Sequence, residues 1–229
     1  MLQPKWLEAI VFDLDGTLVD SAEDLRAACN TLLAEYQRPP LSLPTIKSFI
    51  GDGVPKLVER SVLASGGWPD VEDRQALVRR FLQIYEADPS RRTRPYPGVM
   101  ETLTALRAQG LRIGVCTNKP MAATTRLLAD LGLTPLVDAV AGGDSYPQRK
   151  PSPEPLLGVL RDLAVTPSRA AMIGDNEHDV AAGRAVSMAR VLVMSYGYSR
   201  VPVNELPADG VVDQFAGLPS RLGLSVPHV

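Results

Sequence analysis

The sequence has little of several features that would decide its class at once. Its 229 residues include only two cysteines, Cys29 and Cys116, and 5% aromatic residues. Two cysteines in a chain of this length argue against a disulfide framework, so we expect two buried free thiols. The formal net charge is −2, from 24 basic and 26 acidic side chains, so no general field would attract nucleic acid.

Long apolar runs are also missing. No stretch approaches the roughly 20 apolar residues that a membrane span needs, and no secretory signal precedes the first apolar run. Hydrophobic residues make up 45% of the chain and charged residues 22%, which is ordinary for a globular protein. We therefore expect a cytoplasmic protein with neither a membrane nor a nucleic-acid partner.

The chain does contain a series of short apolar runs, each followed by polar residues or glycine. Continuous apolar runs of this length are typical of strands that are buried on both faces of a parallel sheet. Helical patterns around Leu103, Leu127 and Leu156 separate several of them. This alternation predicts an α/β fold with a doubly wound, Rossmann-like parallel sheet. The runs are 9–12, 113–116, 137–141, 170–173, 191–194 and, more weakly, 211–212.

One connection in this pattern is too long for a single crossover helix. About a hundred residues, 13–112, separate the first two runs, where a crossover needs only a dozen or more. Apolar residues recur there at helical spacing, with breaks at Pro39-Pro40, Gly51-Asp52-Gly53 and Gly66-Gly67. The segment "SAED", residues 21–24, resembles a capping box that would start the first of three helices.

These patterns predict two domains. Residues 20–92 would form an all-helical cap that is inserted after the first strand. Residues 1–19 and 93–229 would form the Rossmann-like core. Asp20, where the insert begins, is expected to be a structural residue of the hinge rather than part of any chemistry.

Side chains that can do chemistry follow four of the apolar runs. In a doubly wound sheet, ligands bind beside the carboxyl ends of the strands. Each of these residues alone is more often a helix cap, a turn residue or a solvated charge, but their convergence on one sheet edge indicates a site. They are Asp13 and Asp15 after the first run, Thr117 and Asn118 after the second, Lys150 after the third, and Asp175 and Asp179 after the fourth.

Four ordered motifs resemble those of the haloacid dehalogenase-like (HAD) hydrolases. The resemblance runs from about Ala9 to Val193, and the insert after the first motif is similar to the helical cap of that family. It implies a phosphomonoester hydrolase that acts on a small phosphorylated metabolite through an aspartyl-phosphate intermediate. The motifs are "FDLDGTLVDS", "VCTNKP", "KPSPEP" and "GDNEHD".

The resemblance implies roles for the first three motifs. Asp13 would be the nucleophile, and Asp15 would first protonate the leaving alcohol and then deprotonate the attacking water. Gly16 would let the backbone turn closely around the phosphate. Thr117 and Asn118 would hold phosphate oxygens. Lys150 would offset the negative charge of the nucleophile and the phosphate.

The resemblance also implies that Mg²⁺ is the cofactor. Asp13 and Asp175 would offer carboxylates to the metal, and Asp15 its backbone carbonyl. Asp179 would hold a metal-bound water or orient Lys150.

The fourth motif also contains Asn176 and His178. Asn176 stands where serine is frequent in the family, and its amide still offers an acceptor. His178 is expected to be exposed at a helix start, because Asp15 already covers the acid/base role.

The substrate should be selected by the cap. "FIGDGVPKLVERS", residues 49–61, resembles the corresponding cap segment of bacterial phosphoglycolate phosphatases. Lys56 and Arg60 lie one helical turn apart and would either meet a substrate carboxylate or remain solvated. We therefore predict hydrolysis of 2-phosphoglycolate to glycolate and phosphate, by a monomer or a homodimer.

Three alternatives stay open on the sequence. One is another HAD phosphatase, for sugar phosphates or pyrophosphate, and another is a phosphomutase similar to β-phosphoglucomutase. The third is a phospho-acceptor module similar to response-regulator receivers, which also brings Asp, Thr, Lys and Mg²⁺ to one sheet edge. Receivers, however, place the acceptor Asp after a middle strand and have no large helical insert.

Overall fold

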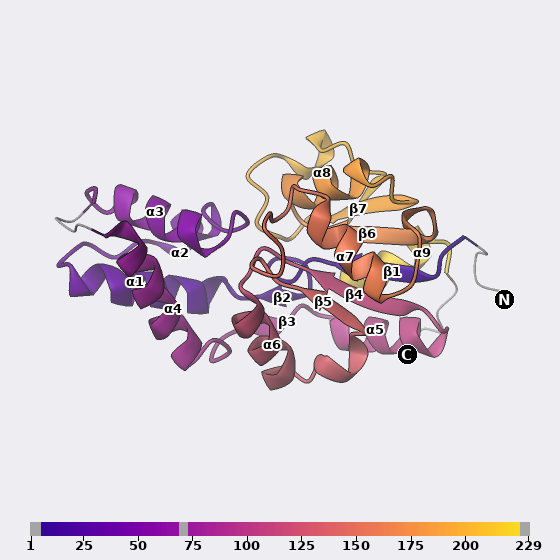
Figure 1. Ribbon diagram of the computed structural model, residues 1–229, viewed down its shortest axis with the longest axis horizontal. Coiled ribbons are helices and arrows are strands. Elements are labelled where there is room, and N and C mark those ends of the chain that lie inside the picture. The colour runs from indigo at the N-terminus through magenta and orange to yellow at the C-terminus, as the bar shows by residue number, and fades with distance from the viewer. Residues whose placement is uncertain (1–5, 69–72, 225–229) are drawn as a thin grey trace.

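The computed structural model describes residues 6–68 and 73–224. Figure 1 shows two parts side by side, a group of helices formed by the early chain and a larger part built on a sheet. No helix in the described ranges is both long enough and apolar enough to cross a membrane. Cys29 and Cys116 are buried free thiols, as expected.

The larger part is built on a six-stranded parallel sheet with the order β5-β4-β1-β6-β7-β8. The first strand lies at its centre, with Ile10 opposite Ile113 on one side and Ala171 on the other. Chain order reverses at this strand, so the loops after β1, β4 and β6 meet around one crevice. The strands are β1 Ala9–Phe12, β4 Arg112–Cys116, β5 Ala139–Ala141, β6 Ala170–Gly174, β7 Arg190–Met194 and β8 Gly210–Val212.

Helices cover both faces of this sheet, so the predicted doubly wound α/β fold is confirmed (Figure 1). Side chains of β1 alternate between two hydrophobic clusters, Ile10 and Phe12 in one and Ala9 and Val11 in the other. Burial on both faces explains why the strand reads as a continuous apolar run. The covering helices are α5 Val99–Ala108 and α6 Met121–Asp130 on one face, and α7 Glu154–Asp162 and α8 Glu177–Ala185 on the other; the short α9 Leu218–Arg221 follows β8.

The smaller part consists of helices from the long connection after β1. They share a third hydrophobic cluster, which includes Leu25, Val58 and Phe81. Three of the four helices were expected, whereas α2 has only five residues and too short a pattern to predict. The helices are α1 Ala22–Glu35, α2 Leu43–Lys47, α3 Val54–Ala64 and α4 Arg74–Ala87.

Two short strands join the cap helices to the core. Strand β2 (Val19–Asp20) pairs antiparallel with β3 (Arg94–Pro95), so the chain leaves and re-enters the core side by side. This pair of strands lies at the limits predicted for the insert. The division into domains at 20–92 stays a prediction. The Asp20 carboxylate accepts a hydrogen bond from the Tyr198 hydroxyl at 2.6 Å, which is consistent with a structural role.

The capping box expected at residues 21–24 is wrong. Ser21 is the N-cap of α1 but makes no side-chain cap bond, and its hydroxyl instead donates to Asp15 Oδ1 at 2.5 Å. Asp24 is buried and accepts hydrogen bonds from the backbone N–H groups of Arg92 and Thr93 and from the Thr93 hydroxyl. The Asp24 side chain therefore binds the segment that returns to the core, and the Ser21 side chain binds Asp15. Neither side chain caps the helix.

Candidate active site

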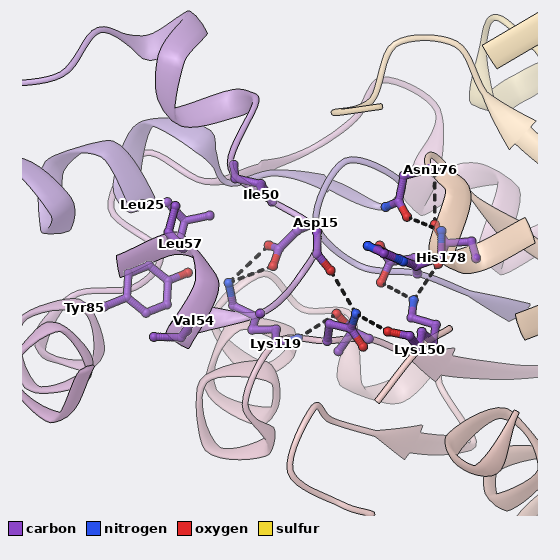
Figure 2. A pocket seen from close by; sticks show the side chains of 16 residues that line it. Asp15, Leu25, Ile50, Val54, Leu57, Tyr85, Lys119, Lys150, Asn176 and His178 are labelled. Atoms are coloured by element: carbon purple, nitrogen blue, oxygen red, sulfur yellow. Dashed lines mark hydrogen bonds and ion pairs between the residues drawn. The ribbon is translucent and has the colours of Figure 1, made fainter. Parts of the chain in front are cut away.

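Six of the seven strand-end residues predicted from the sequence line one pocket between the core and the cap, and Asp175 lies beside two of them, Asp13 and Asp179 (Figure 2). The core supplies the polar lining and the cap supplies mostly apolar side chains. The space open to the centres of water molecules is small, about 40 Å³. The core residues that line it are Asp13, Asp15, Thr117, Asn118, Lys119, Lys150, Asn176, His178 and Asp179, and the cap residues are Leu25, Ile50, Gly51, Gly53, Val54, Leu57 and Tyr85.

Lys150 links two of the buried carboxylates. Its Nζ lies 2.9 Å from Asp13 Oδ1 and 2.6 Å from Asp179 Oδ1. Burial alone would lower the pKa of Lys150, but the Asp13 and Asp179 carboxylates raise it above its ordinary value. The lysine is therefore a permanent positive charge next to Asp13. The contact with Asp179 is consistent with one of its two predicted roles, the orientation of Lys150, and that role stays a prediction.

The buried carboxylates carry more negative charge than Lys150 can balance. Burial raises the pKa of Asp13 to about 6, against the attraction of Lys150, and Asp179 raises it further. Burial, then Asp179 and Asp13, raise the pKa of Asp175 well above its ordinary value. Oxygen atoms of Asp13, Asp175 and Asp179 lie within 4.8 Å of one another, so this triad could hold a metal ion. Hard carboxylate oxygens fit a cation such as Mg²⁺.

Hydrogen bonds from the loops after β6 and β7 hold Asp175 and Asp179 in place. The backbone N–H of Tyr198 donates to Asp175 Oδ2 at 2.6 Å, and the Asn176 amide donates to Asp175 Oδ1 at 3.0 Å. Asp179 Oδ2 accepts from the backbone N–H groups of residues 175 and 176. Asn176 also caps helix α8 through a bond from the His178 N–H. Asn176, which stands where serine is frequent in the family, thus both caps α8 and donates a hydrogen bond to Asp175.

Asp15 has a cationic partner of its own, Lys119. The ammonium of Lys119 lies 3.1 Å from both oxygens of the Asp15 carboxylate, and 4.6 Å from the centre of the Tyr85 ring. Lys119 is buried, and burial alone would lower its pKa, but Asp15 and Tyr85 raise it above the ordinary value. Sequence reasoning missed this residue. Its position directly after Thr117 and Asn118, at a strand end, was the available signal.

Gly16 brings the loops after β1 and β6 into close contact. Its φ is +90°, a conformation that favours glycine, and a Cβ there would collide with the Asp175 carboxylate. Gly16 therefore fits the predicted close turn. Direct contact of this residue with a phosphate stays a prediction.

Thr117 and Asn118 follow β4, as expected. The Thr117 hydroxyl accepts from the backbone N–H of Lys119 at 3.2 Å. The Asn118 amide donates to the backbone carbonyl of Gly51 in the cap at 2.8 Å and to that of Lys150 at 2.9 Å. Asn118 thus ties the cap loop to two core loops, while its Oδ1 is buried without a hydrogen-bond partner. Their predicted contacts with phosphate oxygens stay predictions.

The structure does not bring the two predicted cap cations to the pocket. The Lys56 side chain is 57% exposed and pairs with Glu59 at 2.5 Å. Arg60 pairs with Asp52 and donates to the Phe49 carbonyl at 3.1 Å. The reason is helical geometry, because α3 buries its apolar face, which leaves Lys56 exposed and Arg60 bound to Asp52.

The expectation of an exposed His178 is wrong. Its side chain is only 17% exposed and contacts the Asp52 carboxylate of the cap. Arg200 of the core binds the same carboxylate at 2.5 Å. The sequence offered no signal for this cluster, because its partners are more than a hundred residues apart.

Comparison of the sequence with known protein families agrees with the arrangement of carboxylates and lysines in the pocket. The family model described as haloacid dehalogenase-like hydrolase matches residues 10–193. The chain belongs to the haloacid dehalogenase-like hydrolase family. Because the match covers most of the chain, the receiver-like alternative is excluded.

The relatives of this HAD hydrolase span nearly its whole length. It is 44% identical over 216 residues to a phosphoglycolate phosphatase of Cereibacter sphaeroides, covering 94% of this chain and 98% of the relative. It is 45% identical over 224 residues to a phosphoglycolate phosphatase of Rhodospirillum rubrum, covering 96% and 92%. These relatives place the chain among the phosphatases of the family.

Solved structures are similar as well. A predicted phosphoglycolate phosphatase from Haemophilus somnus 129pt shares 30% of the sequence, with a TM-score of 0.89 over 95% of this chain and 98% of that one. CbbY from Rhodobacter sphaeroides, solved in complex with phosphate, shares 25%, with a TM-score of 0.81 over 95% and 100%. The HAD fold of this chain therefore includes both the core and the cap.

Proposed function

We propose that this HAD phosphatase hydrolyses 2-phosphoglycolate to glycolate and phosphate, with Mg²⁺ as its cofactor. The observation that carries the proposal is the Asp13–Lys150 contact, which lies beside Asp15 in a small pocket that the cap closes. The names of relatives that match nearly the full chain support the same substrate. We expect the enzyme to act in the cytoplasm as a monomer or a homodimer.

The reaction would begin at Asp13. A carboxylate oxygen of Asp13 attacks the phosphorus in line, and the bond from phosphorus to the ester oxygen breaks. Asp15 gives its proton to the departing glycolate oxygen. Asp15 then takes a proton from the water that attacks the aspartyl-phosphate, which releases phosphate and restores Asp13. Lys150 offsets the charge that the phosphoryl group brings next to Asp13.

The buried acidic triad fits a divalent cation. The triad has three carboxylates, and the Lys150 ammonium contacts only two of them, Asp13 and Asp179. The raised pKa values of Asp13 and Asp175 reflect the cost of burying their negative charge. Asp13 and Asp175 would hold Mg²⁺ with their side chains and Asp15 with its carbonyl. When bound, Mg²⁺ would neutralise charge on the phosphate as phosphorus is attacked.

The cap side of the pocket favours a small leaving group. Its side chains are mainly apolar and leave little room, whereas a sugar needs partners for several hydroxyl groups. The apolar side chains are Leu25, Ile50, Val54 and Leu57, together with the ring of Tyr85. We therefore do not propose a sugar phosphatase, a pyrophosphatase or a phosphomutase. The substrate panel described next would detect each of these activities.

A substrate panel with and without EDTA tests the proposal. Purified protein with Mg²⁺ should release phosphate from 2-phosphoglycolate faster than from hexose phosphates or pyrophosphate. Turnover that survives EDTA would contradict the role of the metal. Preference for a hexose phosphate, or conversion of one to an isomer, would contradict the substrate and leave the phosphoryl-transfer chemistry standing.

A further inference from the structure

Lys119 is a buried cation whose charge the steps at Asp13 do not use. Lys150 already serves Asp13 and Asp179, whereas the Lys119 ammonium contacts the carboxylate of Asp15 alone among the pocket's described acidic side chains. Figure 2 shows Lys119 between Asp15 and the cap side chains Leu57 and Tyr85. It therefore lies on the side of the pocket toward which a leaving group extends.

The distances bring Lys119 within reach of that leaving group. The ester oxygen that receives a proton from Asp15 must lie about 2.7 Å from its carboxyl. Both Asp15 oxygens lie 3.1 Å from Lys119 Nζ, so the ester oxygen lies less than about 6 Å from the ammonium. In 2-phosphoglycolate a single methylene group separates this oxygen from the carboxylate. The carboxylate can therefore contact Lys119 while the phosphate occupies the site at Asp13.

Charge favours the same contact. Lys119 is a buried ammonium, and among the described acidic side chains of the pocket it contacts Asp15 alone. A substrate carboxylate would give this ammonium a second negatively charged partner, whereas a neutral alcohol would not.

We propose that Lys119 binds the carboxylate of the leaving group and thereby selects short phosphorylated 2-hydroxy acids over phosphate esters of neutral alcohols. This inference rests on the phosphatase function proposed above. It assigns to a core lysine the task that sequence reasoning gave to Lys56 and Arg60. The surrounding Leu25, Leu57 and Tyr85 limit the acid to a short one.

The test compares 2-phosphoglycolate with its amide, which has the same shape but no carboxylate charge. The wild-type enzyme should show kcat/KM at least about tenfold higher for the acid, the size expected for a hydrogen bond to a charged group. In Lys119→Met, and in Lys119→Gln, which keeps a hydrogen-bond donor for Asp15, this ratio should fall to near one. If Lys119→Met does not fold, Lys119→Gln decides the question.

Arg126→Met is the matched control. It removes a cation from helix α6, on the same segment, where Arg126 is exposed and pairs with Asp130. Its acid-to-amide ratio should equal that of the wild type.

Three results would overturn the inference, and they differ in what else they affect. If the acid-to-amide ratio is unchanged in both Lys119 variants, Lys119 only positions Asp15, and the proposed function stands. If the wild type hydrolyses acid and amide equally well, the carboxylate is not recognised, although the protein is a phosphatase. If it hydrolyses neither, the proposed function itself fails.

Discussion

Nε2 of His178, at the start of the core helix α8, lies 2.5 Å from Oδ1 of Asp52, in the cap loop before α3. Arg200 of the core and Arg60 of the cap bind the other oxygen of the same carboxylate. Burial alone would raise the pKa of Asp52, but these guanidinium groups and His178 hold it well below its usual range. The cap is thus fastened over the pocket by an ionised carboxylate.

Removing this carboxylate should weaken closure of the cap. We expect Asp52→Ala to lower kcat/KM for 2-phosphoglycolate about tenfold, since the loss of charged hydrogen bonds across the interface costs about 1.5 kcal/mol. Steady-state kinetics measure the effect. Glu59→Ala is the control, because Glu59 lies on the cap helix α3 that follows the Asp52 loop and pairs with the exposed Lys56. Equal kinetics in the Asp52 and Glu59 variants would show that the contact has no part in closure.

We expect that Asp13, the proposed nucleophile, can be replaced without loss of the fold. Asp13→Asn should lower kcat by at least about 10³-fold, because an amide cannot form the aspartyl-phosphate. The raised pKa of Asp13 means that the metal-free fold already favours an uncharged group there. The free energy of unfolding, measured with denaturant in EDTA, should therefore change by no more than about 1 kcal/mol. Turnover that persists in Asp13→Asn, while surface variant Asp130→Asn behaves as wild type, would exclude Asp13 as nucleophile.

Stabilisation by Mg²⁺ should increase with pH. Between an ordinary pKa of 3.8 and the raised value of about 6, folded Asp13 binds a proton that the unfolded chain has lost. Raising the pH through this window therefore lowers the free energy of unfolding of the metal-free protein. Mg²⁺ binds the deprotonated carboxylates, so protons compete with it at low pH.

Thermal unfolding with and without Mg²⁺ measures this competition. The increase in Tm caused by Mg²⁺ should be small at pH 5 and large at pH 7.5. A variant with Asp175→Asn should show little increase at either pH. An increase in the wild type that is equal at both pH values would argue against metal binding by Asp13 and Asp175.

The junction of cap and core depends on Asp24. Asp24→Ala would leave two backbone N–H groups and the Thr93 hydroxyl without their buried acceptor. We expect a loss of about 3 kcal/mol in the free energy of unfolding, measured by denaturant titration. Its neighbour Glu23 is partly exposed and pairs with Arg26, so Glu23→Ala should cost less than about 0.5 kcal/mol. Similar losses in the two variants would contradict the structural role of Asp24.

Much of the fold follows from local pattern. The runs at 9–12 and 170–173 are buried on both faces, and such strands are apolar throughout, so sequence alone located them. The third run, 137–141, was predicted two residues too long, because the strand that follows the short 3-10 helix at residues 134–136 begins only at Ala139. Five-residue α2 escaped prediction, because so short a helix has no periodicity to detect.

The sequence by itself determined the class of chemistry, because its four motifs resemble those of the HAD hydrolases. It also predicted the meeting of Asp13, Asp15, Lys150 and Asp175, because they follow strand ends that a parallel sheet brings together. Only the tertiary structure decided which charges meet. It placed Lys119 on Asp15, paired His178 with Asp52 and turned Lys56 toward solvent. The physical reason is that each of these arrangements depends on tertiary packing. Lys119 and Asp15 follow different core strands, His178 and Asp52 meet between core and cap, and Lys56 lies opposite the face that α3 buries. Residues distant in sequence fix that packing, and no local pattern records it.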